Sequence, residues 1–186
     1  MSIVVRRVSA GDVDGVLECL RSYGFHLLGG RYADPEYPAD AVLQVRNAVS
    51  HFDLSRHCWV AEGSGGILGF CSWEWLDRSR RQAKTLLITV LPSARSLGVG
   101  SLLQERRMAE MREEGAREVH TWSDDPRAIR WYQERFGYVE IGREPLLHCL
   151  HRFTWGDRVE WGIHRGFRTS ADLAHLVARL DTGGGT

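Results

Sequence analysis

The spacing of hydrophobic and polar positions predicts that strands and amphipathic helices alternate along the chain. Residues 3–8 are mostly apolar and indicate a first strand, and apolar residues at helical spacing over residues 13–20 indicate a helix after it. A loop rich in glycine, proline and aromatic residues is expected over residues 23–39, followed by a second helix from about residue 40 to 49. The first quarter of the chain is therefore expected to be strand, helix, loop and helix.

The middle of the chain has the pattern of a β-sheet. Two apolar segments, residues 58–61 and 67–75, flank a Ser-Gly-Gly turn and predict a β-hairpin. Residues 84–90 form a dense apolar run that is typical of a buried central strand, and Pro92 ends it. Three consecutive strands are therefore expected here.

Helices and strands alternate again in the C-terminal half. Gly115 and Gly137 suit the C-terminal caps of two predicted helices. Leucine and valine recur at helical spacing over residues 173–180, so a final helix capped by Ser170 is expected. The other elements expected here are a helix over residues 101–114, a strand over 119–122, a helix over 126–136, and a hairpin of residues 139–141 and 146–153.

No internal repeat or break in composition divides the chain. We therefore expect one domain over residues 1–186, with residues 156–186 as a C-terminal extension. The expected fold class is α/β (α+β), with a mixed central sheet of about seven strands flanked by helices, and with an extra C-terminal helix.

Composition and charge narrow the class of protein. The 186 residues are 43% apolar and 26% charged, with a formal net charge of zero, as in ordinary globular domains. No apolar run reaches the roughly 18 residues of a membrane span, and the N-terminus is not a secretory signal. We therefore expect a cytoplasmic protein with no membrane contact. The balanced charge argues against a nucleic-acid partner.

The sequence around Arg95 combines the features of an anion-binding turn. An apolar strand is followed by a short loop, and a helix begins at Gly98 and Gly100. The N–H groups at a helix start attract phosphate, glycine allows close approach, and Arg95 adds a positive charge. The stretch lacks both the Gly-Lys-Ser/Thr ending of an ATP or GTP loop and the G-x-G-x-x-G of a dinucleotide site. By itself, the pattern equally fits a plain strand–loop–helix turn that needs two glycines.

Two stretches of the sequence resemble motifs of the GNAT acetyltransferases. The first, VLPSARSLGVG over residues 90–100, resembles the family's R/Q-x-x-G-x-G/A motif and its preceding Val-x-Pro. The second, residues 125–138, resembles the family segment in which Asn, Ala, Tyr and Gly-Phe/Tyr follow one another, although Asp125 stands in place of the Asn. The residues that match in it are Ala128, Tyr132, Gly137 and Tyr138. The resemblance implies the GNAT fold, with acetyl-CoA as the acyl-donor cosubstrate.

The resemblance also implies which residues hold acetyl-CoA. In this family the loop amides hold the pyrophosphate of CoA, and the preceding strand pairs with the pantetheine arm. Val90 is then expected at the acetyl-pantetheine end, and Asp125 beside the cosubstrate. The residues implied at the pyrophosphate are Arg95, Ser96, Gly98, Val99, Gly100 and Ser101.

Acetyl transfer to an amine needs an acid for the leaving thiolate and a base for the amine. Tyr132 is the expected general acid, because a phenol is protonated at neutral pH and the resemblance gives this tyrosine that role. His120, on the strand before the Tyr132 helix, is the first choice for the base, and Glu74, between two tryptophans, is the alternative. A histidine in a polar part of the sheet is an equally good interpretation of His120.

The sequence therefore predicts an N-acetyltransferase that acts by direct attack on a primary amine of a small molecule or an amino acid. A protein N-terminal or lysine acetyltransferase, and a non-catalytic acyl-CoA-binding module, remain open as alternatives. The resemblance also implies a homodimer. No metal is expected, because His148 and His151 would face opposite sides of a predicted strand.

Overall fold

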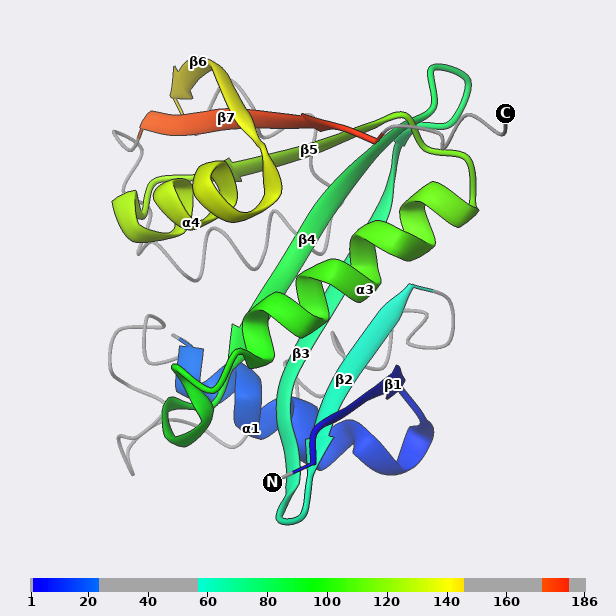
Figure 1. The fold of residues 1–186 in the computed structure, drawn as a ribbon, viewed down its shortest axis with the longest axis vertical. Coiled ribbons are helices and arrows are strands. Elements are labelled where there is room, and N and C mark those ends of the chain that lie inside the picture. Colours follow the sequence, from blue (N-terminus) through cyan, green and yellow to red (C-terminus); the bar gives the residue numbers. More distant parts are fainter. Residues whose placement is uncertain (1, 24–56, 146–171, 181–186) are drawn as a thin grey trace, which may run out of the picture. The chain divides into compact units, whose positions relative to one another are not determined.

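The computed structural model describes residues 2–23, 57–145 and 172–180 (Figure 1). The predicted loop over residues 23–39 (apart from Tyr23), the helix over residues 40–49, the second hairpin strand over residues 146–153, and His148 and His151 lie outside them. In chain order the elements are β1 (Val4–Arg7), η1 (Ala10–Asp12), α1 (Val13–Tyr23), β2 (Cys58–Gly63), β3 (Gly66–Asp77), β4 (Gln82–Val90), η3 (Pro92–Ala94), α3 (Val99–Glu113), β5 (Glu118–Ser123), α4 (Pro126–Phe136), β6 (Val139–Pro145) and β7 (Asp172–Arg179).

The described strands form one mixed sheet of seven strands in the order β1-β2-β3-β4-β5-β7-β6. The pairs β1–β2, β2–β3, β5–β7 and β6–β7 are antiparallel, and β4–β5 is parallel. The predicted mixed central sheet of about seven strands is thus confirmed. Within the described residues, none of the helices is long and apolar enough to cross a membrane.

The chain divides into two compact units, each with its own core. Of the described residues, the first unit contains 2–23, 57–72 and 87–107, and the second contains 73–86, 108–145 and 172–180. Strands β3 and β4 and helix α3 each contribute residues to both units.

In the first unit, α1 begins at a small hydrogen-bonded motif. The Asp12 carboxylate accepts from the backbone N–H of Ser9 at 2.7 Å and from the guanidinium of Arg6 at 2.7 and 2.8 Å. These contacts, of which the Arg6 hydrogen bond is the largest, hold the pKa of Asp12 far below its ordinary value. The buried residues Val16 and Leu17 then place the apolar face of α1 in the core.

Glycine lets α3 pack closely against β3 in the first unit. A Cβ atom on Gly69 would lie 2.9 Å from Leu103 Cδ1 and 2.9 Å from the carbonyl oxygen of Thr89. Leu103 and Val99 are buried here in a cluster with apolar residues of β2 and β3. Because Gly69 has only a hydrogen atom as its side chain, α3 and β4 can both approach β3 closely at this position.

Helix α3 begins two residues earlier than predicted, and its buried side is largely polar. Gln104, Arg107 and Glu110 are each at most 1% exposed. In the first unit, Arg107 donates to the carbonyl oxygens of Ser72 at 2.9 Å and Leu87 at 3.0 Å. In the second, Trp73 Nε1 donates to Glu110 Oε2 at 2.6 Å. Buried polar residues with partners therefore explain why the apolar stripe of this helix is imperfect.

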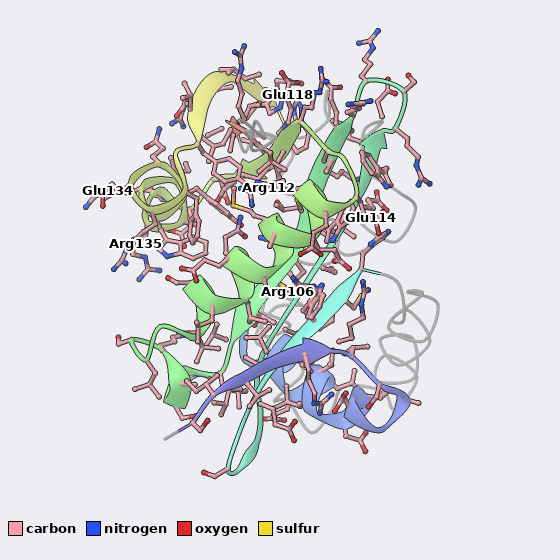
Figure 2. The ribbon with its side chains drawn as sticks, turned by 45° about the vertical axis from the view of Figure 1, so that its right-hand side comes forward. Arg106, Arg112, Glu114, Glu118, Glu134 and Arg135 are labelled. Carbon is pink, nitrogen blue, oxygen red and sulfur yellow. The ribbon has the colours of Figure 1, made fainter. Side chains whose placement is uncertain are left out.

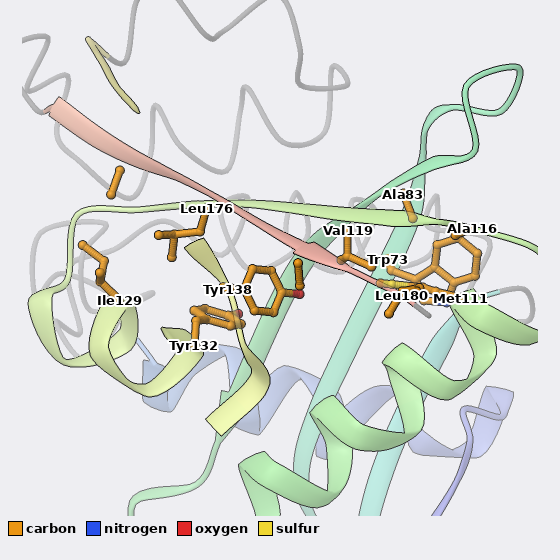
Figure 3. Packing of buried hydrophobic residues seen from close by; sticks show 12 residues of the cluster. Trp73, Ala83, Met111, Ala116, Val119, Ile129, Tyr132, Tyr138, Leu176 and Leu180 are labelled. Atoms are coloured by element: carbon orange, nitrogen blue, oxygen red, sulfur yellow. The ribbon is translucent and has the colours of Figure 1, made fainter. Parts of the chain in front are cut away.

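The second unit is built around α4, β5 and β7 (Figure 3). The N-cap of helix α4 is Asp125, whose carboxylate accepts from the N–H of Arg127 at 2.9 Å. Its C-cap is Gly137, which has a left-handed φ of 66°. Both bounds of α4 agree with the prediction. Its apolar side buries Ile129 and Tyr132, and the charged side chains of Glu134 and Arg135 point outward from the other side (Figure 2).

The predicted extra C-terminal helix is wrong, because residues 172–179 form strand β7 between β5 and β6. Leu173, Leu176, Val177 and Leu180 have helical spacing, but the alanines between them are buried as well. A short apolar run buried on both faces fits either element, and periodicity alone does not separate the two. Backbone pairing with two neighbouring strands decides in favour of the strand.

Candidate active site

The turn after β4 is exposed and stabilised mainly by its own backbone. Leu91 N–H donates to the carbonyl of Leu68 at 2.8 Å, which fixes the end of β4 against β3. Ala94 N–H donates to Leu91 O at 2.9 Å and closes the short helical turn η3. Ala94 is buried, whereas residues 95–98 are exposed. The turn is therefore anchored by the buried Ala94, and residues 95–98 are accessible to solvent.

Two residues in this turn have the left-handed backbone conformation. Gly98 has a φ of 80°, and Ser96 has a φ of 67°, which is uncommon for a residue with a side chain. A Cβ atom on Gly98 would meet nothing within 4 Å, so glycine is needed for the backbone angle rather than for lack of space. The positive φ is a strained conformation for Ser96, which has a side chain, and such strained residues are concentrated at ligand sites.

The N-terminus of α3 follows the turn directly. Its first hydrogen bond runs from Leu102 N–H to Gly98 O at 3.1 Å, so the N–H groups of Val99, Gly100 and Ser101 precede the helical ladder. The first turn of α3 carries no acidic residue, and the exposed Arg95 adds a positive charge to the same unit. This arrangement suits an anion such as pyrophosphate.

Strands β4 and β5 are paired over only part of their length. Their parallel register contains Gln82–Glu118, Ala83–Val119 and Lys84–His120, and β4 continues to Val90 beyond it. After the last pair, the hydroxyl groups of Thr85 and Thr121 still meet at 2.6 Å. The ladder therefore ends at His120, the predicted base.

Tyr132 lies in the core of the second unit. It is 5% exposed, and its ring centroid lies 5.0 Å from that of Tyr138 (Figure 3). The ring centroid of Trp131 lies 4.9 Å away. Aromatic rings of α4 and of the segment after it are therefore among its neighbours in this cluster.

His120 is buried and faces a second histidine, His175 of β7. Nδ1 of His120 lies 2.9 Å from Nε2 of His175, and Glu118 Oε2 lies 3.6 Å from His120 Nε2. Trp122 stacks on His175 with ring centroids 4.3 Å apart, and Glu144 Oε1 lies 3.7 Å from His175 Nδ1. Sequence reasoning missed His175 because a helix was predicted there. The available signal was a single histidine inside an otherwise apolar run.

The two carboxylates beside these histidines come from different strands, Glu118 from β5 and Glu144 from β6. Gln82 Nε2 donates to Glu118 Oε2 at 2.8 Å. This hydrogen bond is the largest cause of a lowered pKa for Glu118, and the charge of His120 acts in the same direction.

Glu74, the alternative base, is ion-paired rather than surrounded only by apolar groups. Its Oε1 lies 2.7 Å from Nζ of Lys84, which is 1% exposed. A buried ammonium group needs such a counter-ion, so the carboxylate has a structural role. Lys84 is the one lysine of the chain, and no local sequence signal links it to Glu74.

The predicted site residues fall into two sets. Residues 90–101, the predicted cosubstrate turn, belong to the first unit. Tyr132, His120, Glu74 and Asp125 belong to the second. Within the second unit the structure joins His120 to His175, whereas Glu74 contacts Lys84 and Asp125 caps α4.

Comparison with known proteins identifies the family. A model of the acetyltransferase (GNAT) family matches residues 21–138. An uncharacterized N-acetyltransferase, CT2212 of Chlorobaculum tepidum, is 27% identical over 108 residues. That alignment covers 58% of this chain and 66% of the relative, just under two thirds of its length.

Solved structures share the fold over almost the whole chain. Ard1 from Thermoplasma volcanium has a TM-score of 0.64 at 19% identity and covers 97% of this chain and 99% of its own. The ribosomal-protein-S18-alanine N-acetyltransferase of Escherichia coli has a TM-score of 0.65 at 12% identity, covering 100% and 98%. The protein yncA of Salmonella typhimurium, solved with its cofactor acetyl-CoA, has a TM-score of 0.63 at 18% identity, covering 100% and 98%. The predicted fold class is thereby confirmed, and with the family match the chain belongs to the GNAT family of acetyltransferases.

Proposed function

We propose that this protein transfers an acetyl group from acetyl-CoA to a primary amine of a small molecule or an amino acid. The observation that carries the proposal is the exposed turn before α3, with left-handed backbone at Ser96 and Gly98 and with backbone amides that precede the first hydrogen bond of the helix. The family match supports the same reaction, since acyl transfer is its common activity. A formal net charge of zero gives no attraction to a polyanionic acceptor.

In this proposal the turn binds the pyrophosphate of acetyl-CoA. The amides of Val99, Gly100 and Ser101 donate to its oxygens, and Arg95 and Ser96 complete the turn around them. Val90, the last residue of β4, lies toward the acyl end of the cosubstrate. Fixed amides of this kind hold the anion without reorganising when it binds.

The chemical step is a direct attack of the amine nitrogen on the thioester carbonyl. A C–N bond forms, the C–S bond breaks, and the sulfur takes a proton from the Tyr132 hydroxyl. The amine nitrogen gives up a proton to His120 through water, because both ring nitrogens of His120 are buried. The buried place of Tyr132 among aromatic rings supports its role, because exclusion of water strengthens a hydrogen bond to sulfur.

Calorimetric titration with acetyl-CoA tests the cosubstrate site, with Gly98→Glu as the disabling variant. The added carboxylate repels the pyrophosphate and the side chain strains a left-handed backbone, so we expect affinity to fall at least about 100-fold. Gly115→Glu is the matched control, since Gly115 also has a positive φ and open space, but at the far end of α3.

An amine screen then tests the acceptor class, with amino acids, polyamines and peptides with free N-termini in parallel. Turnover of a small amine supports the proposal. Turnover of the peptides alone would instead identify protein N-termini or lysines as the acceptors. Absence of acetyl-CoA binding by the wild-type chain would contradict the proposal altogether.

A further inference from the structure

Four titratable side chains form a chain across one face of the second unit. Trp122 and His175 are register partners on β5 and β7, and His120 lies two residues before Trp122, so all three share a face. Glu144 pairs with Leu173, two residues before His175, and Glu118 lies two residues before His120. The order along the face is Glu118, His120, His175, Glu144.

The central contact limits how many protons the two rings hold. A 2.9 Å separation between Nδ1 of His120 and Nε2 of His175 accommodates one hydrogen, donated by one ring and accepted by the other. Two imidazolium rings would place two N–H groups against each other. While the contact persists, the pair therefore holds either no charge or one positive charge, as a coupled unit.

The flanking groups favour one tautomer of the uncharged pair. The two carboxylates lie at similar distances from the outer ring nitrogens, Glu118 at 3.6 Å from Nε2 of His120 and Glu144 at 3.7 Å from Nδ1 of His175, but Glu118 Oε2 also accepts from Gln82 at 2.8 Å. A proton on Nδ1 of His175 then faces a carboxylate, and Nε2 of His175 accepts from Nδ1–H of His120. Nε2 of His120, which is buried, is then the nitrogen without a proton, and the proton released by the amine reaches it through water.

Among the described residues, basic side chains also lie at register positions beside this face. Lys84 of β4 is the register partner of His120 and is ion-paired to Glu74 at 2.7 Å. Arg179 of β7 is the register partner of Glu118 and contributes to the low pKa of that carboxyl. When His120 takes up a proton on Nε2, Glu118, 3.6 Å away, is the carboxylate that stabilises the imidazolium ring.

We propose that His175 is a positioning residue for the base His120, and that the two rings take up a single proton between them. This inference rests on the proposed function, because only amine acetylation gives the base its task. The amine loses one proton, Nε2 of His120 gains it, and the hydrogen between the rings remains shared. Trp122, stacked at 4.3 Å, fixes the plane of the His175 ring.

Nitrogen-15 NMR of the histidine rings tests the pair without any need for turnover. We expect the signals of His120 and His175, assigned with His120→Gln and His175→Gln, to shift together with one midpoint and a total uptake of one proton. In the uncharged state, the proton of His120 is expected on Nδ1. Uptake of one proton by each ring independently, or a proton on Nε2 of uncharged His120, would overturn the proposal.

Kinetics against pH then test the positioning role. His175→Leu removes the acceptor for His120 Nδ1–H, so we expect kcat to fall about 10- to 100-fold, KM to change less than about threefold, and the acidic limb of the kcat/KM profile to move. In His175→Gln an amide oxygen can replace Nε2 as acceptor, so most of the activity should return. Unchanged kcat and pH profile in a folded His175→Leu protein would refute the role of His175. If that variant does not fold, the wild-type NMR titration and His175→Gln still decide.

The two proposals fail in distinguishable ways. A wild-type protein that binds no acetyl-CoA and acetylates no amine contradicts the proposed function, whereas the NMR titration still reports whether the pair takes up one proton. Normal acetylation together with independent histidines contradicts only the present inference.

Discussion

The turn before α3 and the histidine-bearing face of the second unit are built in opposite ways. The turn is made by consecutive residues, and its functional atoms are backbone amides whose direction follows from Ser96, Gly98 and the start of the helix. The face is made by side chains from β5, β6 and β7, which are brought together only by strand register. A backbone site can therefore be recognised in a short sequence motif, whereas a side-chain site of this kind requires the fold.

The largest expected effect separates a reacting side chain from a packing one in the same cluster. Tyr132→Phe removes the proposed proton donor to sulfur, so we expect kcat to fall about 100-fold with acetyl-CoA affinity nearly unchanged. Tyr138→Phe is the matched control, since its ring lies 5.0 Å from that of Tyr132 in the same core. Equal turnover in both variants, measured at saturating acetyl-CoA, would remove Tyr132 from the mechanism.

The second prediction concerns the ion pair under the alternative base. Glu74→Gln removes the carboxylate charge that faces the buried Lys84 at 2.7 Å. We expect the free energy of unfolding to fall by about 2–3 kcal/mol, below the range for fully buried pairs because Glu74 is partly exposed. The double variant Glu74→Leu with Lys84→Met should recover most of this loss. Urea denaturation measures both. A loss in Glu74→Gln below about 0.5 kcal/mol would argue for a solvated pair with little structural role.

Helix α4 and strand β7 of the second unit show why the sequence predicted some features and missed others. Helix α4 was predicted with correct bounds because Asp125 and Gly137 mark its ends locally. Strand β7 was predicted as a helix because Leu173, Leu176 and Leu180 have helical spacing in a short apolar run that is buried on both faces. The two strands that pair with it lie far away in the sequence.

The candidate site divides in the same manner. The exposed turn at residues 95–98, with the helix start after it, agrees with the expectation from the glycine spacing. The partners of the proposed acid–base residues were not foreseen. His175 and Lys84 lie 55 and 10 residues from the groups they contact, and their pairing depends on strand register that no local motif encodes.

The third prediction tests how closely α3 packs against β3 in the first unit. Gly69→Ala places a methyl group 2.9 Å from the backbone oxygen of Thr89, which has little freedom to move. We expect a loss of about 1–3 kcal/mol in unfolding free energy. Gly142→Ala in β6 is the control, because a Cβ atom there meets nothing within 4 Å. If thermal melting gives equal stability for both variants, α3 is less closely packed on β3 than the structure indicates.

The smallest effect is expected for substitutions of Asp125, which test whether this residue caps α4 or binds acetyl-CoA. Its carboxylate accepts from the N–H of Arg127 at 2.9 Å, and an Asn oxygen can accept the same bond. Asp125→Asn should therefore change stability by less than about 0.5 kcal/mol, whereas Asp125→Ala should cost about 1 kcal/mol. Acetyl-CoA titration of the same variants completes the test. If Asp125 only caps α4, affinity stays constant in both variants. A change in affinity for Asp125→Asn that persists at high salt, with stability preserved, would assign the side chain to the cosubstrate, because salt screens the effect of a charge that acts at a distance.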